Sequence, residues 1–554
     1  RAGSSSQADQ HETTYRPSDY RTTGHLMAKM TSTEPIKRPV PMTVYGAVAI
    51  IATGGLLFGY IIGINSNVVT KGQLICPTDW KGPVGTWTSS GYGQCWHLTD
   101  LSMGVLSSMN LIGALVSSMF CFKYGDVLGR KREVQIGAVL YFMGSCTAAL
   151  SPTLWGVFLG FAIYGLGIGF AMHAAPVYIA EVSPPEVRGT LVSAKEAAIV
   201  MGMVFGYGVG AIFASTTDGW RFMAGAGAIF AFALGAGIVL LHRSPRWLVL
   251  QAVQRGSALQ PDAALLEEAK AAMKFFRGDY PEEVEAELQS ILSEAAAVAQ
   301  DKPAGWQETF HYPKPLIIGW GLVTLQQVTG QPSVLYNATN IFKSAGLSNT
   351  ATLSSFGVGI VKLLATLVTV WRVDQFGRKQ LLYWGIGMMA VALAILAIAF
   401  YQTQCEIPLA LGSACPDDMV KIPGAWGWAT VLALMLYVSG YQLGFGPISW
   451  LMISEIFPLR VRGAALSTAA VVNFSFNILM NTTQSTLTSV LSSSGTYTAY
   501  LFMTFLALWF VHTQVIETKG LTLEEIEREM TSVSSKAEAA SLLKSAKEGY
   551  GAAA

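Results

Sequence analysis

A cluster of amide and hydroxyl side chains interrupts an apolar part of the chain. The stretch TLQQVTGQPSVLYNATN follows the apolar run PLIIGWGLV and carries five such residues: Gln326, Gln327, Gln331, Ser333 and Asn337. Amides both donate and accept hydrogen bonds, and so do hydroxyls. These residue types in apolar surroundings therefore suit a buried ligand that is itself ringed by hydroxyl groups. The alternative is hydrogen bonding between neighbouring helices in a membrane.

Apolar runs of about 20 residues, each long enough to cross a bilayer, make up most of the chain. Twelve of them lie near residues 43–66, 100–123, 133–151, 154–179, 190–214, 221–242, 315–342, 351–371, 380–401, 425–452, 463–490 and 497–516. Only 13% of the 554 residues are charged, against roughly 25% in soluble proteins. The sequence predicts an all-α membrane protein of twelve transmembrane helices. The net charge of +1 gives no indication of a nucleic-acid partner.

Lysine and arginine gather in the loops that follow the even-numbered spans. The positive-inside bias therefore predicts cytoplasmic termini and a cytoplasmic central segment, in which acidic and apolar residues at helical spacing indicate two or three short amphipathic helices. The expected parts are a disordered tail or targeting remnant over 1–42, a six-helix bundle over 43–248, a cytoplasmic helical linker over 249–312, a second six-helix bundle over 313–518 and a C-terminal cytoplasmic tail over 519–554.

Two pairs of cysteines share predicted loops. Cys76 and Cys95 lie in the first non-cytoplasmic loop, and Cys405 and Cys415 lie in the loop after the ninth span. Each pair could form a disulfide in an oxidising compartment. Unpaired thiols are the alternative, because spacing alone does not fix the geometry of a disulfide.

The two halves of the chain repeat each other. GDVLGRK at 125–131 returns as VDQFGRK at 373–379, and IAEVSPPEVRG at 179–189 returns as ISEIFPLRVRG at 453–463. Parallel six-helix repeats are an architecture of membrane transporters, which bind their substrate between the halves near the membrane midplane. No HExxH, GxxxxGK[ST] or GxSxG motif is present. We therefore expect a transporter and not an enzyme, with no cofactor and no metal.

These repeats, together with SPRW at 244–247, QQVTGQ at 326–331, GPISW at 446–450 and ETKG at 517–520, resemble the sugar porters of the major facilitator superfamily. The resemblance covers about residues 43–530, and stretches such as MHAAPVYIAE look most like plant and algal vacuolar and plastidic sugar transporters. It implies the major facilitator fold and alternating-access movement of a hexose, glucose first, or a similar sugar. It also implies a monomer in a vacuolar or plastid envelope membrane, with the plasma membrane as an alternative.

The resemblance assigns sugar-binding roles to residues of three helices. Gln326 and Gln327 match the family's paired glutamines, and Trp450 matches its stacking tryptophan. An aromatic face suits the C–H side of a sugar ring. Gln442 and Asn477 fall on the family's contact positions in the tenth and eleventh helices.

Other positions depart from the family pattern. Glu196 replaces a glutamine of the fifth helix, and Lys362 replaces a small polar residue of the eighth. Ionisable residues deep in a membrane usually line a cavity and are paired, so we expect a contact between them. The alternatives are a Glu196 paired with Lys195, or a Lys362 that extends toward the interface. Pro332 replaces a family asparagine, and neighbouring Ser333 is carried over in its place.

Six charged residues in the cytoplasmic turns match an ion-pair latch with which the family holds the outward-open state: Arg130, Glu181, Arg188, Arg378, Glu455 and Arg462. The alternative is a set of solvated interface residues, because one exposed pair contributes only about 0–1 kcal/mol. The appearance of the residues in both repeats favours the latch.

The first and fourth helices lack an acid–arginine pair that proton-coupled relatives carry. Ile61 and Phe161 stand at these two positions. A proton coupler needs a group whose charge changes during the cycle, so the sequence predicts a facilitative transporter. The alternatives are a symporter that uses Glu196, a polyol transporter, and a sugar sensor without transport.

Overall fold

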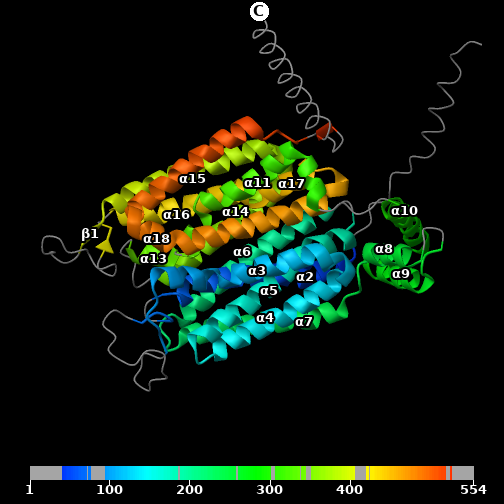
Figure 1. Ribbon diagram of the computed structural model, residues 1–554, viewed down its shortest axis with the longest axis horizontal. Coiled ribbons are helices and arrows are strands. Elements are labelled where there is room, and N and C mark those ends of the chain that lie inside the picture. The colour runs from blue at the N-terminus through cyan, green and yellow to red at the C-terminus, as the bar shows by residue number, and fades with distance from the viewer. Residues whose placement is uncertain are drawn as a thin grey trace, which may run out of the picture. The chain divides into compact units, whose positions relative to one another are not determined.

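The structure is a computed structural model. It describes residues 40–70, 73–76, 94–184, 187–256, 260–300, 306–336, 338–344, 351–405, 420–422, 425–519 and 525–526. Within these ranges the chain is almost entirely helical (Figure 1). The two strands found there, β1 (Gln404–Cys405) and β2 (Val420–Lys421), pair antiparallel. The all-α prediction is confirmed.

Six long helices form the first half of the described chain. They are α2 (Met42–Val68), α3 (Asp100–Leu128), α4 (Arg130–Leu150), α5 (Leu154–Val182), α6 (Arg188–Phe213) and α7 (Gly219–Leu240). All six contain stretches long and apolar enough to cross a membrane. Glycines let these helices pack backbone to backbone, as is common in membranes. A Cβ atom added at Gly206 of α6 would lie only 2.4 Å from the carbonyl oxygen of Tyr60 on α2.

The second half contains four further membrane-span candidates and one broken helix. Its helices are α11 (Pro313–Val328), α12 (Gln331–Tyr336), α13 (Ala338–Ser344), α14 (Ala351–Phe376), α15 (Arg378–Tyr401), α16 (Ala425–Leu443), α17 (Phe445–Ile456) and α18 (Leu459–Gln514). Ser492 interrupts α18 with a φ of 63°, so α18 holds the last two predicted spans. Ten helices in the described residues qualify as spans, and the count of twelve stays a prediction.

The predicted seventh span is broken at Gly330. This residue has a φ of +99°, and a Cβ atom there would lie 2.5 Å from the ring of Tyr500. Both the conformation and the close approach therefore require glycine. The break places the amides of the QQVTGQ motif on two separate short helices.

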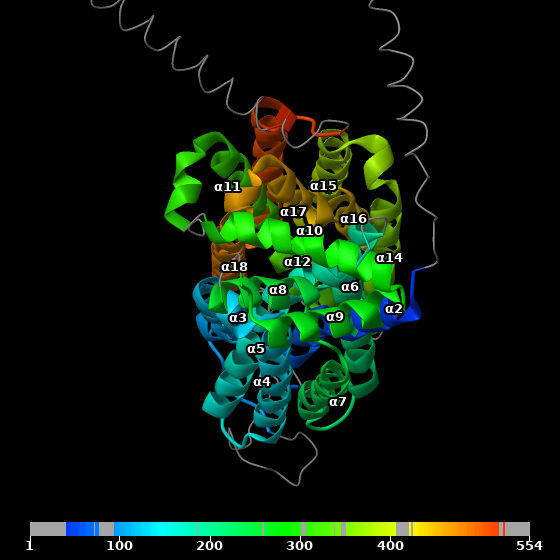
Figure 2. The ribbon, with the colours of Figure 1, turned by 90° about the vertical axis from the view of Figure 1, so that its right-hand side faces the viewer.

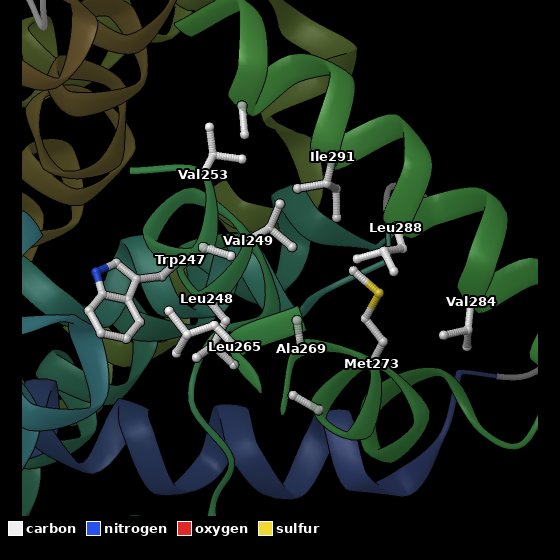
Figure 3. Packing of buried hydrophobic residues seen from close by; sticks show 13 residues of the cluster. Trp247, Leu248, Val249, Val253, Leu265, Ala269, Met273, Val284, Leu288 and Ile291 are labelled. Atoms are coloured by element: carbon white, nitrogen blue, oxygen red, sulfur yellow. The ribbon is translucent and has the colours of Figure 1, made fainter. Parts of the chain in front are cut away.

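Three linker helices, α8 (Pro245–Arg255), α9 (Ala263–Arg277) and α10 (Pro281–Gln300), lie at one end of the bundle (Figure 2). They bury an apolar core of their own, which includes Leu248, Met273 and Leu288 (Figure 3). The 3₁₀ helix η1 (Trp306–His311) follows them. Arg277 joins the linker to the first half, because its guanidinium donates to the carbonyl of Val182 at 2.6 Å.

A disulfide between Cys76 and Cys95 closes the first loop, with 4.9 Å between the Cα atoms. Of the two alternatives that the spacing left open for this pair, the structure has the disulfide. Cys415 lies outside the described residues, so the second pair stays a prediction. Next to the bridge, the backbone nitrogen of Gln94 donates to Oδ1 of Asp218 at 2.7 Å. The side-chain Nε2 of Gln94 donates to the carbonyl of Pro152 at 2.6 Å. The loop is thereby attached to the ends of three helices.

Replacing Cys76 and Cys95 together by serine should destabilise the protein. The bridge closes a loop with a sequence separation of 19 residues, so its loss should lower the free energy of unfolding by about 3 kcal/mol. Thermal unfolding in detergent measures the effect. Cys146→Ser is the matched control, because Cys146 is a free cysteine. Equal melting temperatures for the double variant and the control would contradict this prediction.

Candidate functional site

The paired glutamines lie at the end of α11, where they face helices of the second half. The amide nitrogen of Gln326 donates to the carbonyl of Phe445 at 3.1 Å, and its amide oxygen accepts from Asn473 at 2.9 Å. Gln326 therefore holds α11, α17 and α18 together. These bonds are the helix–helix alternative that the sequence left open, and they bring Asn473 into the same network.

Two buried amide oxygens next to this network have no protein partner. Gln327 is only 3% exposed, and its Oε1 has no hydrogen-bond partner. Asn477 on α18 is half-buried as a residue, but its Oδ1 atom is buried and also has no hydrogen-bond partner. A buried acceptor without a partner costs about 1–3 kcal/mol, and a hydroxyl of a ligand would remove that cost. Among the sequence-predicted residues, these two are the best suited to bind one.

The remaining predicted contacts are distributed over several helices. Ser333 lies on α12 and its hydroxyl bonds the hydroxyl of Tyr500 at 2.8 Å, so it contributes to packing against α18. Gln331 at the start of α12 and Trp450 on α17 are half-buried. Gln442 on α16 is buried. Asn337 lies outside the described residues.

The two ionisable residues of the predicted site do not form the direct ion pair that we expected. Glu196 instead pairs with its neighbour Lys195, with 3.2 Å between Oε1 and Nζ. Lys362 is 4% exposed, and its ammonium lies 5.3 Å from the centre of the Tyr441 ring. A cation over an aromatic face is stabilised without a carboxylate partner. Tyr441 is a residue that the sequence reasoning missed, although it precedes Gln442 directly.

Ion pairs at the repeated turns join helices of the same half. Arg130 and Glu181 connect α4 to α5 at 3.2 Å, and Arg378 and Glu455 connect α15 to α17 at 2.9 Å. Arg462 donates to the carbonyl of Phe457 within its own half at 3.3 Å. Arg188 is the first residue of α6. The structure thus places the six predicted latch residues at one end of the bundle.

The turns themselves are covered in a similar way in both halves. Gly129 has a φ of 81° and lies under the ring of Trp247, which a Cβ atom would approach to 2.7 Å. Gly377 has a φ of 84° and lies under the carboxylate of Glu517. A Cβ atom added at Gly377 would lie 2.8 Å from Oε2 of Glu517. Glu517 also accepts from the backbone nitrogen of Arg378 at 2.9 Å. The SPRW and ETKG motifs therefore serve equivalent turns.

Contacts between the halves occur at the opposite end of the bundle. Thr339 of α13 bonds Ser66 at 3.1 Å and Asn67 at 3.2 Å, both at the end of α2. Asn481 of α18 donates to Ser108, near the start of α3, at 3.0 Å. The protein is therefore closed between its halves at the end remote from the charged turns.

The positions of the proton-coupling pair are apolar and buried. Ile61 on α2 is 2% exposed and Phe161 on α5 is 3% exposed. Neither side chain can carry a charge or a proton, so the residues at these two positions provide no proton-binding group.

Comparison with known proteins identifies the class to which this fold and site belong. Residues 47–530 match the family model for sugar (and other) transporters. The chain belongs to this family, and the predicted resemblance to the sugar porters of the major facilitator superfamily is confirmed. It is a sugar transporter of the multi-pass membrane type.

Similar proteins include transporters of a plant and of bacteria. The chain is 40% identical to D-xylose-proton symporter-like 2 of Arabidopsis thaliana over 86% of this chain and 88% of the relative. It is also 40% identical to the chloroplastic D-xylose-proton symporter-like 3 of the same plant, over 86% of this chain and 80% of the relative. Among solved structures, the proton:xylose symporter XylE bound to 6-bromo-6-deoxy-D-glucose superposes with a TM-score of 0.67 and 27% identity, over 88% of this chain and 99% of that one.

Gln327→Ala and Trp450→Ala, each made singly, should weaken sugar binding and leave the protein folded. Removal of the buried amide of Gln327 should cost about 1–3 kcal/mol, or roughly 5- to 150-fold in affinity. Removal of the Trp450 ring takes away the aromatic face on which the sugar would stack. Equilibrium binding to purified protein measures the change. Ser333→Ala is the matched control, because its hydroxyl is already bonded to Tyr500 and its loss should lower stability more than affinity. Unchanged affinity in both test variants would contradict the site.

Proposed function

We propose that this transporter moves a monosaccharide, with hexoses such as glucose as the first candidates, by alternating access and without proton cotransport. The main support for a sugar as the substrate is the pair of buried amide oxygens on Gln327 and Asn477, neither of which has a protein partner. Each can accept a hydroxyl hydrogen, and a sugar ring presents several hydroxyls. Trp450, half-buried on the neighbouring α17, supplies an aromatic face for the ring.

The names of the relatives make pentoses the strongest competitors. D-xylose differs from D-glucose by one hydroxymethyl group, and one such group in a pocket discriminates by only about 10- to 200-fold. Competition of unlabelled glucose, xylose and a polyol against labelled glucose uptake ranks the three substrates. Preferential inhibition by the polyol would exclude the monosaccharide proposal.

The facilitative mechanism rests on Ile61 and Phe161. An acid left alone in a low-dielectric cavity is costly, and so is an arginine, whereas two apolar residues pack without that cost. The joint replacement of acid and arginine by buried apolar residues is therefore what we expect of a chain that does not use this pair.

A symporter that uses Glu196 is the second candidate. Its carboxylate is 22% exposed and pairs with the ammonium of Lys195. A carboxylate within a group of ionisable side chains can bind a proton in one state of a transport cycle. The relatives named as proton symporters favour the same candidate.

We also infer that the structure is an inward-facing state. By the positive-inside bias the charged turns face the cytoplasm, so the contacts of Thr339 and Asn481 close the other side. The similarity to a chloroplastic relative supports the plastid envelope or the vacuolar membrane as the location. A monomer is sufficient for this mechanism, since both halves of the bundle belong to one chain.

Proteoliposomes with equal sugar concentrations on both sides and an imposed pH gradient test the coupling. Facilitated transport predicts no net accumulation, because no charged group links proton movement to sugar movement. The experiment measures labelled glucose and xylose separately in the parent and in Glu196→Gln, which should behave alike. Accumulation that Glu196→Gln abolishes would replace the facilitator by the Glu196 symporter.

Two substitutions at opposite ends of the bundle should shift the conformational equilibrium in opposite directions. Thr339→Val removes the bonds to Ser66 and Asn67 that help to close the non-cytoplasmic side, so it should populate the outward-open state. Glu455→Gln weakens the latch and should populate the inward-open state. The measurement is the labelling rate of a single cysteine introduced at the non-cytoplasmic mouth, which should rise in the first variant and fall in the second. Equal rates in both would contradict the latch and the closure together.

A further inference from the structure

Three potential metal ligands meet inside the first half, away from the sugar site. Cys121 of α3, Glu133 of α4 and His173 of α5 each offer a donor atom, and the three atoms lie within 4.8 Å of one another. Cys121 is 1% exposed and Glu133 is 0% exposed, whereas the His173 side chain is 29% exposed. The cluster is therefore buried on two sides and accessible at the imidazole.

The carboxylate of Glu133 is only partly satisfied by the protein. Its Oε2 lies 2.7 Å from Nδ1 of His173, but its Oε1 is buried without a hydrogen-bond partner. A buried carboxylate with an unused oxygen is costly. Gly125 keeps space free beside it, because a Cβ atom there would lie 2.7 Å from Cε1 of His173 and 3.1 Å from Oε1 of Glu133.

The fold itself does not demand these residue types. In the register of the two repeated motifs, 125–131 with 373–379 and 179–189 with 453–463, the second half has a counterpart for each position. These counterparts are Thr369, Leu381 and Pro447. The second half thus has no thiol, carboxylate or imidazole at these three positions, so the repeat alone does not explain the cluster.

We propose that Cys121, Glu133 and His173 form a binding site for a divalent cation of borderline softness, with Zn²⁺ as the type case. Thiolate, imidazole and carboxylate are the ligands that Zn²⁺ takes in proteins, and three of them leave a fourth position for water. On binding, the thiol of Cys121 releases its proton to solvent, and the charge of the cation compensates the buried thiolate and carboxylate.

The geometry requires only a small adjustment. Zn²⁺ bonds of about 2.0–2.3 Å place tetrahedral ligand atoms roughly 3.3–3.8 Å apart, so the widest separation must shorten by about 1 Å. The bond between Glu133 and His173 must lengthen somewhat, which a side-chain rotation allows. The imidazole of His173, which is 29% exposed, gives the cation its entry. Since all three ligands lie in the first half, binding should stabilise that half and leave the path between the halves open.

Spectroscopic titration of the purified full-length protein tests the site. Co²⁺ bound through a thiolate gives a charge-transfer band in the near ultraviolet, and Zn²⁺ should remove this band by displacing Co²⁺. We expect Cys121→Ser to abolish the band and to weaken Zn²⁺ binding by at least about 100-fold, with a similar loss of affinity for His173→Gln. Cys146→Ser is the matched control and should keep the band, because it removes a free cysteine that does not belong to the cluster.

Thermal unfolding gives a second, independent measurement. Zn²⁺ should raise the melting temperature of the parent and of Cys146→Ser, but not that of Cys121→Ser, His173→Gln or Glu133→Gln. Melting curves without metal show which variants fold, and any one that folds is sufficient for the comparison. A parent without a thiolate band, or a band that Cys121→Ser retains, would overturn the site. The Glu133–His173 contact would then be only a hydrogen bond between α4 and α5.

Discussion

Water is absent from the hydrocarbon layer, so every polar group placed there must find its partner within the protein. Helices satisfy the backbone, and close glycine contacts such as Gly206 against Tyr60 satisfy the need for packing between them. Polar side chains are then used sparingly. Gln326 occupies both of its amide atoms with Phe445 and Asn473. Under the same constraint, the oxygens of Gln327 and Asn477, which no protein group completes, are free to accept from a ligand that enters the bundle.

The features that could be predicted from the sequence are those that depend on residues next to one another in the chain. Span positions follow from the length of apolar runs, and the repeat of GRK and VRG motifs places the charged turns at one end of the bundle. The break in the seventh span also has a local signal, because Gly330 and Pro332 flank Gln331. These features depend on neighbouring residues, for which propensity and hydropathy are informative.

Partner choice among polar side chains could not be predicted in the same way. The bond from Asn473 to Gln326 spans 147 residues, and no spacing rule identifies it. Glu196 pairs with Lys195, the neighbouring residue on the same helix. Lys362 lies on α14, and its ammonium lies over the ring of Tyr441. Ion pairs in the turns were predicted by residue type, and in the contacts described each of them joins helices of one half.

The contact between Gly129 and the ring of Trp247 determines which half of the bundle the linker helices move with. Trp247, in the first turn of linker helix α8, lies against the first-half turn at Gly129. Arg277 donates to the carbonyl of Val182, and Thr43 donates to the carbonyl of Phe275 at 2.8 Å. The linker helices therefore contact the first half at three points. The segment around Glu517 contacts the second half, because Glu517 accepts from the backbone nitrogens of Arg378 and Lys379. A fluorophore attached to α9 would move with the first half, and one attached to the ETKG segment would move with the second. The efficiency of energy transfer between them would therefore report the distance between the halves during the transport cycle, and neither label would lie in the sugar site.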